Sequence, residues 1–197
     1  MDFTFLEVND SELLEKVFAF RYNIVSEIYP EYFKISCATG TTEQDEYDPY
    51  STHFAVLDKD DEVCATVRLI YNSPIGYPTE NSMVFDRDMF DKNKLGEMSR
   101  IFVDAKYRNI KTTKMIVKHL NELLYVKMMR LGIEYTYGSL EGRFLRLLKI
   151  CKMNYNILGE EQMHKYVGLR YPSILYTEQF GNDNPELVEL WERENES

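Results

Sequence analysis

Apolar and polar residues alternate along the chain with two different periods, and each period predicts one kind of element. Apolar residues spaced by about 3.5 positions predict an amphipathic helix over residues 9–28, capped by Asn9 or Asp10 and ended by Pro30. Arg21 falls within the apolar stripe of this helix. A guanidinium in that place needs a carboxylate partner or a path to solvent.

Shorter apolar runs bounded by turn residues predict the strands of a sheet. The expected strands are residues 53–57, 63–70, 97–103, 133–137, 155–158, 164–169 and 174–177. The expected later helices are residues 112–131, capped by Thr112 or Thr113 and ended by Gly132, then 142–151 and 185–194. Residues 31–50 and 72–95 are expected to be irregular or rich in loops. A hairpin followed by a strand–helix–strand unit predicts a mixed α/β (α+β) fold in one domain over residues 1–197.

The most informative of these strands is Gly96–Val103. Strand alternation predicts one face with Glu97, Ser99, Ile101 and Val103, and the other with Met98, Arg100 and Phe102. A Glu and a Ser two positions apart in a central strand indicate a polar site inside a core. Glu97 could act as a general base, directly or through a water, if burial raises its pKa. The alternative is a structural ion pair with a neighbouring arginine.

Carboxylates crowd the short segment 43–48, which contains Glu43, Asp45, Glu46 and Asp48. Arg21, Arg68 and Arg100 all fall in the interiors of expected helices or strands. Buried guanidinium groups need anions, so we expect the segment's carboxylates to pair with these arginines beside the active site. The alternative is a solvated run of charges. Glu43 is the second candidate for the base.

Composition narrows the classes of function. The chain has 197 residues, 44% of them hydrophobic, which supports a sizeable core. Its net charge of −10 argues against nucleic-acid binding by the whole surface. Residues 106–152 nevertheless hold eleven basic residues against three acidic ones, a local charge of +8. Such a zone either steers one acidic partner to one face or is ordinary solvated helix surface.

Three scattered cysteines, Cys37, Cys64 and Cys151, make a disulfide framework or a zinc site unexpected and favour a reducing cytoplasm. No apolar stretch approaches the roughly 20 residues of a membrane-spanning helix. The first residues carry no secretory pattern. The sequence has no credible nucleophilic triad, no metal-ligand spacing and no G-x-G-x-x-G or Walker loop. We expect a cytoplasmic protein without a metal, a membrane span or a nucleic-acid partner.

Several of these residues together match a family pattern. Glu43-x-Asp45-x-x-Asp48, then Arg68, then Glu97-x-Ser99-Arg100 resemble the acyl-homoserine-lactone (autoinducer) synthases of quorum sensing. The resemblance is closer to the N-acyl amino acid synthases and the exosortase-associated acyltransferases. That group's first-helix Arg-Tyr motif, its D-x-x-D…S-x-H segment and its V-R-L-I strand are similar to segments 20–27, 45–54 and 66–70.

The resemblance implies a GCN5-related N-acyltransferase (GNAT) fold, in which a pantetheine arm lies between two strands that splay apart. It also implies direct attack of an amine on an acyl thioester, with no acyl-enzyme. The co-substrate would be an acyl-4′-phosphopantetheine thioester of acyl carrier protein or coenzyme A, and no cofactor would be bound permanently. The implied catalytic residues are Glu97, Glu43 and Ser99. The implied acceptor-side residues are Arg21, Asp45, Asp48, Arg68, Arg100 and Phe102. The implied donor-side residues are Val103, Arg108, Lys111, Thr112, Thr113, Arg143 and Arg146, with backbone N–H groups after Phe102 binding the oxyanion.

Departures from the family pattern bear on both substrates. Val25 and Glu31 stand where homoserine-lactone synthases carry an aromatic pair, which disfavours S-adenosylmethionine as the acceptor. The segment 108–113 lacks the glycines with which coenzyme A enzymes wrap a pyrophosphate. With the adjacent basic zone, this favours an acyl carrier protein donor and an amino acid or related amine as acceptor. The open alternatives are a homoserine-lactone synthase, a coenzyme A-dependent N-acetyltransferase and a degenerate domain that only binds an acyl carrier.

Overall fold

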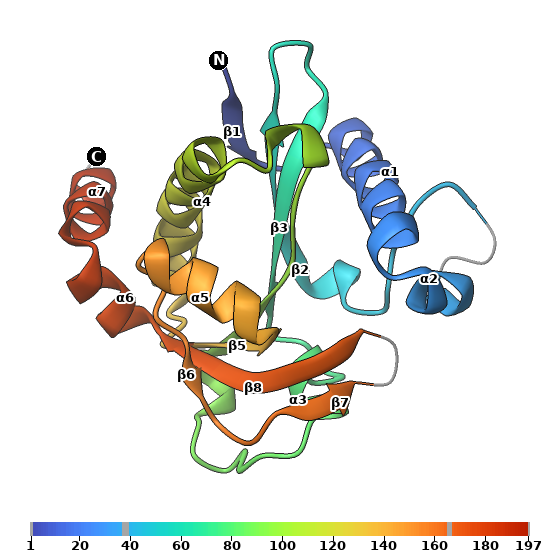
Figure 1. Cartoon of the computed structure of the whole chain (residues 1–197). Coiled ribbons are helices and arrows are strands. Elements are labelled where there is room, and N and C mark those ends of the chain that lie inside the picture. The colour runs from blue at the N-terminus through green and yellow to red at the C-terminus, as the bar shows by residue number, and fades with distance from the viewer. Residues whose placement is uncertain (1, 37–39, 165–166, 197) are drawn as a thin grey trace.

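The computed structural model of the chain describes residues 2–36, 40–164 and 167–196. Within these ranges eight strands form one sheet in the order β1-β2-β3-β4-β5-β8-β6, with β7 paired to β8 (Figure 1). The strands are β1 (Thr4–Glu7), β2 (Ser51–Leu57), β3 (Val63–Tyr71), β4 (Leu95–Val103), β5 (Tyr135–Leu140), β6 (Asn156–Ile157), β7 (Gln162–His164) and β8 (Gly168–Tyr176). The helices are α1 (Ser11–Ile28), α2 (Pro30–Ser36), α3 (Pro78–Ser82), α4 (Ile110–Leu131), α5 (Gly142–Ile150), α6 (Thr177–Asp183) and α7 (Pro185–Asn195), with 3₁₀ turns at Asp48–Tyr50, Lys92–Lys94 and Ala105–Tyr107.

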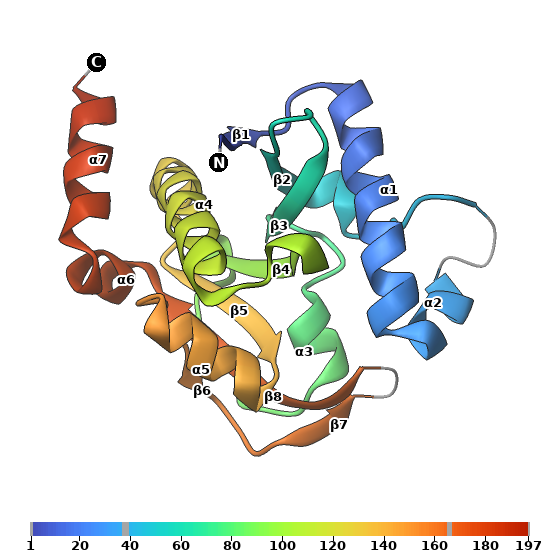
Figure 2. The same cartoon turned by 45° about the horizontal axis from the view of Figure 1, so that its top comes forward.

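Helices cover both faces of the sheet, as Figure 2 shows for α1 and α4 on opposite sides of the central strands. On one face, α4 buries Ile116 and Leu120 in a cluster that includes Met98. On the other face, α1 buries Val17 and Ile24 in a second cluster. The only parallel neighbours described in the sheet are β4 and β5, which α4 connects. The expected mixed, mostly antiparallel sheet flanked by helices is confirmed.

Where element boundaries differ from expectation, the causes are local. Asp10, one of two expected caps, caps α1 by accepting a hydrogen bond from the backbone N–H of Leu13. Pro30 follows α1 but also begins α2, because a proline in the first helical turn loses no hydrogen bond. The expectation that residues 31–50 are irregular is therefore wrong at their start.

Two further expectations are wrong. Asn109 caps α4 in place of Thr112 or Thr113, because its side chain accepts a hydrogen bond from the backbone N–H of Thr112. The single strand expected over residues 164–169 is instead the end of β7 at His164 and the start of β8 at Gly168, and residues 165–166 lie outside the described residues. The sequence pattern also misses β1, α3 and α6, which are too short to show a period.

A β-bulge interrupts β4 and changes which residues share a face. The register pairs Arg68 with Ser99 but Thr66 with Phe102, so β4 holds one residue more than β3 between these pairs. Arg100 lies in the inserted stretch with a φ of 52°, in the left-handed region that non-glycine residues seldom adopt. The strict alternation expected over residues 97–103 is therefore wrong beyond Ser99.

The bulge determines which face of the sheet each side chain of β4 after Ser99 occupies. Met98 and Ile101 both pack into the cluster under α4, although strict alternation would separate them. Phe102 packs into the cluster under α1. Ser99 and Arg100 both bond to polar groups on the α1 side. The α4 side of the strand is therefore apolar, and the α1 side carries its polar chemistry.

The sheet opens at its centre between β4 and β5. The two strands pair only through Leu95–Glu97 and Tyr135–Tyr137. Beyond that point β5 continues to pair with β8 as far as Leu140, while β4 continues with β3 as far as Val103. We call this separation, between residues 98–103 and 138–140, the β4–β5 divergence. The expected splayed pair is thus present, with β5 starting two residues later than expected.

The cysteines that the structure describes are free thiols. Cys64 is buried and Cys151 is half-buried, while Cys37 lies outside the described residues. Across the described ranges, no helix has the length and apolar character to cross a bilayer.

Candidate active site

Three arginines and three carboxylates close into a ring on the α1 side of the sheet. Its members, which we call the charge ring, are Arg21 of α1, Arg68 of β3, Arg100 of β4, and Glu43, Asp45 and Asp48 of the loop before β2. Each arginine bridges two carboxylates and each carboxylate bridges two arginines. The ring is therefore electrically balanced and ties the loop to a helix and two strands.

The contacts of the ring are short and partly bidentate. Arg21 holds Asp48 through two hydrogen bonds of 2.7 and 3.0 Å and donates to Glu43 at 2.5 Å. Arg68 donates from one nitrogen to Asp45 at 2.5 Å and to Asp48 at 2.8 Å. Paired, charge-assisted contacts of this kind fix both distance and orientation.

Arg100 completes the ring because the bulge turns its side chain to the α1 side. Its guanidinium donates to Glu43 at 2.7 Å and to Asp45 at 2.8 Å. It also donates to the hydroxyl of Tyr32 on α2 at 2.8 Å. The left-handed backbone at this residue is therefore tied to three partners that the neighbouring segments supply.

Burial and the arginine charges compete for the carboxyl groups of the ring. Burial raises the pKa of Glu43, but the charges of Arg100 and Arg21 outweigh it and leave that pKa lowered. The same competition lowers the pKa of Asp45 and leaves the pKa of Asp48 far below its usual value. All three carboxyls are ionised at neutral pH. The expected pairing with the three arginines is confirmed for Glu43, Asp45 and Asp48, whereas Glu46 is exposed.

Two nitrogen atoms beside the ring have no hydrogen-bond partner among the described residues: Nη2 of Arg68 and Nε2 of His53. Nε2 of His53 lies 3.6 Å from an oxygen of Asp48. Burial lowers the pKa of His53 to about 4, and the nearby Asp48 charge restores it only in part. His53 is therefore neutral at neutral pH and adds no charge to the ring.

Glu97 lies where β4 and β5 last pair, on the same sheet face as Ser99. Its carboxylate accepts hydrogen bonds from the backbone N–H of Thr79 at 2.9 Å and from the Thr79 hydroxyl at 2.8 Å. Only 2% of the residue is exposed, and burial raises the pKa of Glu97 to about 7 against the effect of these bonds. Within the described residues it forms no ion pair. A carboxyl that exchanges its proton near neutral pH suits general base catalysis.

Ser99 contacts the charge ring from the face of β4 that also carries Glu97. Its hydroxyl accepts a hydrogen bond from Nε of Arg68 at 2.9 Å. The two polar residues of β4 that the sequence placed on one face do share it. Ser99 thus helps to position Arg68, and Glu97 occupies the next position on that face.

The expected donor-side residues lie where β4 ends and on the two helices over the α4 side. The carbonyl of Val103 accepts a hydrogen bond from Arg108 at 2.7 Å. Arg108 and Lys111 are exposed at the start of α4, and Arg143 and Arg146 are exposed on α5. The two helices bury side chains in one common cluster. Thr112 is buried and Thr113 half-buried, so neither presents its side chain fully to solvent.

Four polar residues at the site escape sequence reasoning. Tyr32 and Thr79 contact Arg100 and Glu97 from segments that the pattern assigned to loops. Tyr29 accepts a hydrogen bond from Arg170 of β8 at 3.2 Å. Arg170 falls between the strands expected over residues 164–169 and 174–177, so the signal that singled out Arg68, an arginine inside an expected strand, did not reach it.

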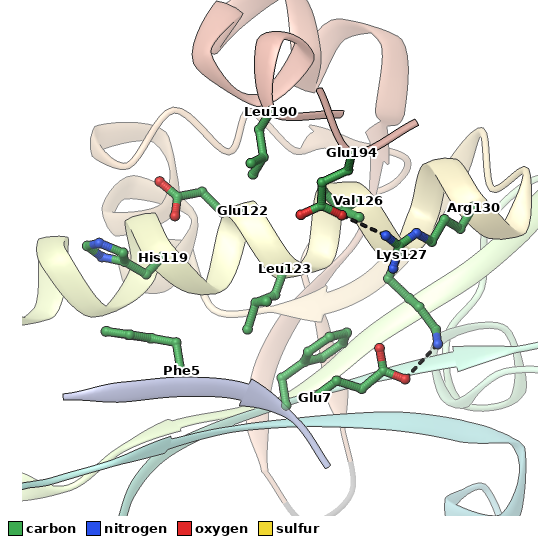
Figure 3. Close-up of a pocket in the computed structure, with 11 residues that line it drawn as sticks. Phe5, Glu7, His119, Glu122, Leu123, Val126, Lys127, Arg130, Leu190 and Glu194 are labelled. Carbon is green, nitrogen blue, oxygen red and sulfur yellow. Dashed lines mark hydrogen bonds and ion pairs between the residues drawn. The ribbon is translucent and has the colours of Figure 1, made fainter. Parts of the chain in front are cut away.

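One hollow of the described surface lies away from the charge ring. A cavity of about 420 Å³ opens between β1, α4 and α7, with Phe5, Leu123 and Leu190 among its walls (Figure 3). Ion pairs of Lys127 with Glu7 and of Arg130 with Glu194 close one end of it. No member of the charge ring lines this cavity.

Comparisons with known proteins agree with this fold. No curated protein sequence matches the chain. The solved structure of TofI, in a complex with an inhibitor and MTA, superposes with a TM-score of 0.72 at 14% identity, covering 95% of this chain and 100% of that one. BjaI, a CoA-dependent acyl-homoserine lactone synthase, gives 0.69 at 16% identity over 90% and 83% of the two chains. FeeM, an N-acyl amino acid synthase from uncultured soil microbes, gives 0.65 at 11% identity over 92% and 94%.

These structures share the fold of this chain, and a family model tests the sequence itself. The model of the acetyltransferase (GNAT) domain matches residues 20–118, which is half of the chain. The matched range contains the whole charge ring, Glu97 and the start of α4. The expected acyltransferase class is confirmed: the chain belongs to the acetyltransferase (GNAT) domain family.

Proposed function

We propose that the protein transfers a fatty acyl group from a phosphopantetheine thioester to the amine of an amino acid or a related small amine. The observation that carries this proposal is the position of Glu97. It is a buried carboxyl with a pKa of about 7 at the start of the β4–β5 divergence, beside the charge ring. The fold is shared with FeeM, whose product class is an N-acyl amino acid, and with acyl-homoserine lactone synthases.

In the proposed reaction the pantetheine arm enters the β4–β5 divergence from the α4 side, and the amine approaches from the α1 side. The amine nitrogen attacks the thioester carbon, a C–N bond forms, and the C–S bond breaks to release the thiolate. Glu97 accepts the proton that the amine loses, directly or through a water. Backbone N–H groups of β4 near Phe102 and Val103 stabilise the negative oxygen of the tetrahedral centre. The charge ring holds the bulge, and with it this stretch of β4, in place.

We propose acyl carrier protein as the donor in preference to free coenzyme A. Phosphate groups bind well at helix N-termini with free backbone N–H groups. At the start of α4 the backbone N–H of Thr112 donates to the side chain of Asn109, and the backbone N–H of Thr113 donates to the backbone carbonyl of Asn109. These two N–H groups are therefore not free to bind a phosphate. The exposed cations around this helix start suit the acidic surface of a carrier protein. BjaI is CoA-dependent and shares the fold, so both donors belong in the test.

The direct experiment offers the protein a set of acyl carrier protein thioesters and acyl-CoA thioesters with a mixture of amino acids. We expect thiol release that depends on the amine, and a product that mass spectrometry identifies as an N-acyl amino acid. Absence of amine-dependent thiol release with every donor and every amine would contradict the proposal. Release with acetyl-CoA alone would favour an N-acetyltransferase.

Charge reversal tests the donor surface, defined as Arg108, Lys111, Arg143 and Arg146. A variant with all four changed to Glu should raise KM for the carrier-protein donor and barely change kcat at saturation. The reason is that these contacts are equal in the ground state and the transition state. The effect should shrink at high salt, where exposed charges are screened. Steady-state kinetics at two ionic strengths measure it.

A control variant reverses four exposed cations outside this surface: Lys16, Lys34, Lys92 and Arg193. It changes the net charge equally, so it isolates the position of the charges from their number. If both variants raise KM alike, or neither does at low salt, the donor surface has no specific role.

We also propose a cytoplasmic location. The free thiols of Cys64 and Cys151 suit a reducing compartment. Fractionation of cells that produce the protein tests this.

A further inference from the structure

Arg170 is a buried arginine that the charge ring does not include. It lies on β8, and only 5% of the residue is exposed. Its guanidinium donates to the carbonyl of Leu169 at 2.9 Å and to the Tyr29 hydroxyl at 3.2 Å, and lies 3.0 Å from a carboxylate oxygen of Glu141. It is thus held by β8, by the residue that follows α1 and by the segment that leads into α5.

Arg170 faces the same side of the sheet as Glu97. Residues 170 and 174 share a face of β8, and Ile174 packs in one cluster with Tyr137. Tyr137 is paired with Glu97 at the start of the β4–β5 divergence, while Tyr171 is paired with Leu140 at its far end. Arg170 therefore lies beyond the open end, roughly 13 Å along the strand direction from the last β4–β5 pair.

Two tyrosines of the α1–α2 junction contact Arg170 and the charge ring, one each. The hydroxyl of Tyr29 accepts a hydrogen bond from Arg170. Tyr32 is bonded to Arg100 directly. In Figures 1 and 2 the β7–β8 end of the sheet reaches toward the junction of α1 and α2, which carries these tyrosines. Arg170 and Arg100 are thus each bonded to a tyrosine of the α1–α2 junction, on the face of the sheet from which the amine is proposed to approach.

The partners of Arg170 differ from those of the ring arginines. Each ring arginine bonds to two carboxylates that are at most 12% exposed. Arg170 has one carboxylate partner among the described residues, Glu141, whose side chain is 43% exposed against 7% for Arg170. A half-exposed glutamate regains solvation when it turns away, so it is replaced at little cost, whereas a buried guanidinium always needs an anion.

We propose that Arg170, with the hydroxyl of Tyr29, binds the carboxylate of the amine acceptor, and that Glu141 is the counter-ion it displaces. The guanidinium accepts a carboxylate in a two-point contact. The amine end of the acceptor then points along the opening toward β4. This inference rests on the proposed function and narrows the acceptor class to amines that carry a carboxylate.

The test compares an amino acid with its carboxamide as acceptors, using one donor at saturation. Arg170→Gln should raise KM for the amino acid by roughly 10- to 100-fold, the size of a charge-assisted hydrogen bond, and leave KM for the carboxamide nearly unchanged. Glu141→Gln should lower KM for the amino acid, because it removes the competing carboxylate. Arg130→Gln, which breaks the exposed ion pair with Glu194, is the matched control and should change neither KM.

The opposite changes in KM expected for Arg170→Gln and Glu141→Gln distinguish a binding role of Arg170 from a purely structural role of its ion pair with Glu141. Both substitutions break the same ion pair, so a tether alone would make both variants change in the same direction and affect both acceptors. That result would overturn the inference, as would an unchanged ratio of the two KM values in Arg170→Gln. If Arg170→Gln does not fold, Arg170→Lys keeps the charge without the two-point contact and should raise KM for the amino acid less. A wild-type enzyme that acylates no amine rejects the proposed function itself, which is a separate outcome.

Discussion

Glu97→Gln is expected to lower turnover by roughly 10²- to 10⁴-fold, the range that general acid–base catalysis supplies. The amide has the shape of the carboxyl and can still accept a hydrogen bond from Thr79, but it cannot take a proton from the amine. Donor binding should stay unchanged. Single-turnover rates with a saturating donor measure the loss, and higher pH should restore part of the rate because more acceptor amine is then already deprotonated.

The difference in stability between this variant and the wild type should depend on pH with a definite sign. Burial raises the pKa of Glu97 to about 7 in the folded protein, above the value near 4.5 of an unfolded chain. The wild type therefore loses stability as pH rises from about 4.5 to 7, while the amide that replaces the carboxyl does not titrate. The variant should match the wild type near pH 5 and exceed it at pH 8 by up to about 3 kcal/mol in free energy of unfolding. A variant that is less stable at pH 8 and turns over normally would assign Glu97 a structural role.

Asp48→Ala is expected to lower the free energy of unfolding by about 3–5 kcal/mol, the cost of breaking a buried ion pair. Asp48 holds Arg21 by two hydrogen bonds and Arg68 by a third, so its loss leaves two fully buried guanidinium groups with one carboxylate each. The loop before β2 should loosen, and activity should fall with it. Denaturant unfolding gives the energy, and hydrogen exchange locates the change.

An exposed aspartate provides the control for that experiment. Asp60 pairs with Lys59 in the turn between β2 and β3, where both side chains are exposed, and Asp60→Ala should change stability little.

Low pH should lower the stability of the wild type in the same way as the Asp48 substitution. The pKa values of Glu43, Asp45 and Asp48 are lowered in the folded protein, so their stabilisation is present at neutral pH and is lost as pH falls below about 4. Equal losses for the two alanine variants would contradict a stabilising ring.

The parts of this site that sequence could predict follow from the general free-energy cost of burying a charge without a partner. A buried arginine needs an anion, so Arg21, Arg68 and Arg100 could be matched to the nearby acidic segment before any contact was known. Which arginine bridges which carboxylates depends on how a helix, two strands and a loop meet in space. The sheet order and the parallel β4–β5 pair follow from a strand–helix–strand pattern, which has few alternative topologies.

The parts that sequence could not predict depend on local geometry or distant contacts. The bulge lies at Arg100, a residue type that gives no signal of a left-handed backbone. The contact of Thr79 with Glu97 depends on a short helix without a period. The contact of Tyr29 with Arg170 joins residues 141 positions apart, which no local pattern reports.

The extra residue in β4 makes the length of this strand matter more than any single side chain in it. A strand has two sides only, so a β4 that kept all its residues but lost the bulge would exchange the faces of everything after Ser99. Phe102 would turn toward α4, and Ile101 toward α1. Substitutions here remove one contact at a time, whereas loss of the bulge at full strand length would misplace a whole edge of the site at once. Sequence alignments with relatives that lack the bulge must therefore open a gap at Arg100, or every residue after it will be compared with the wrong counterpart.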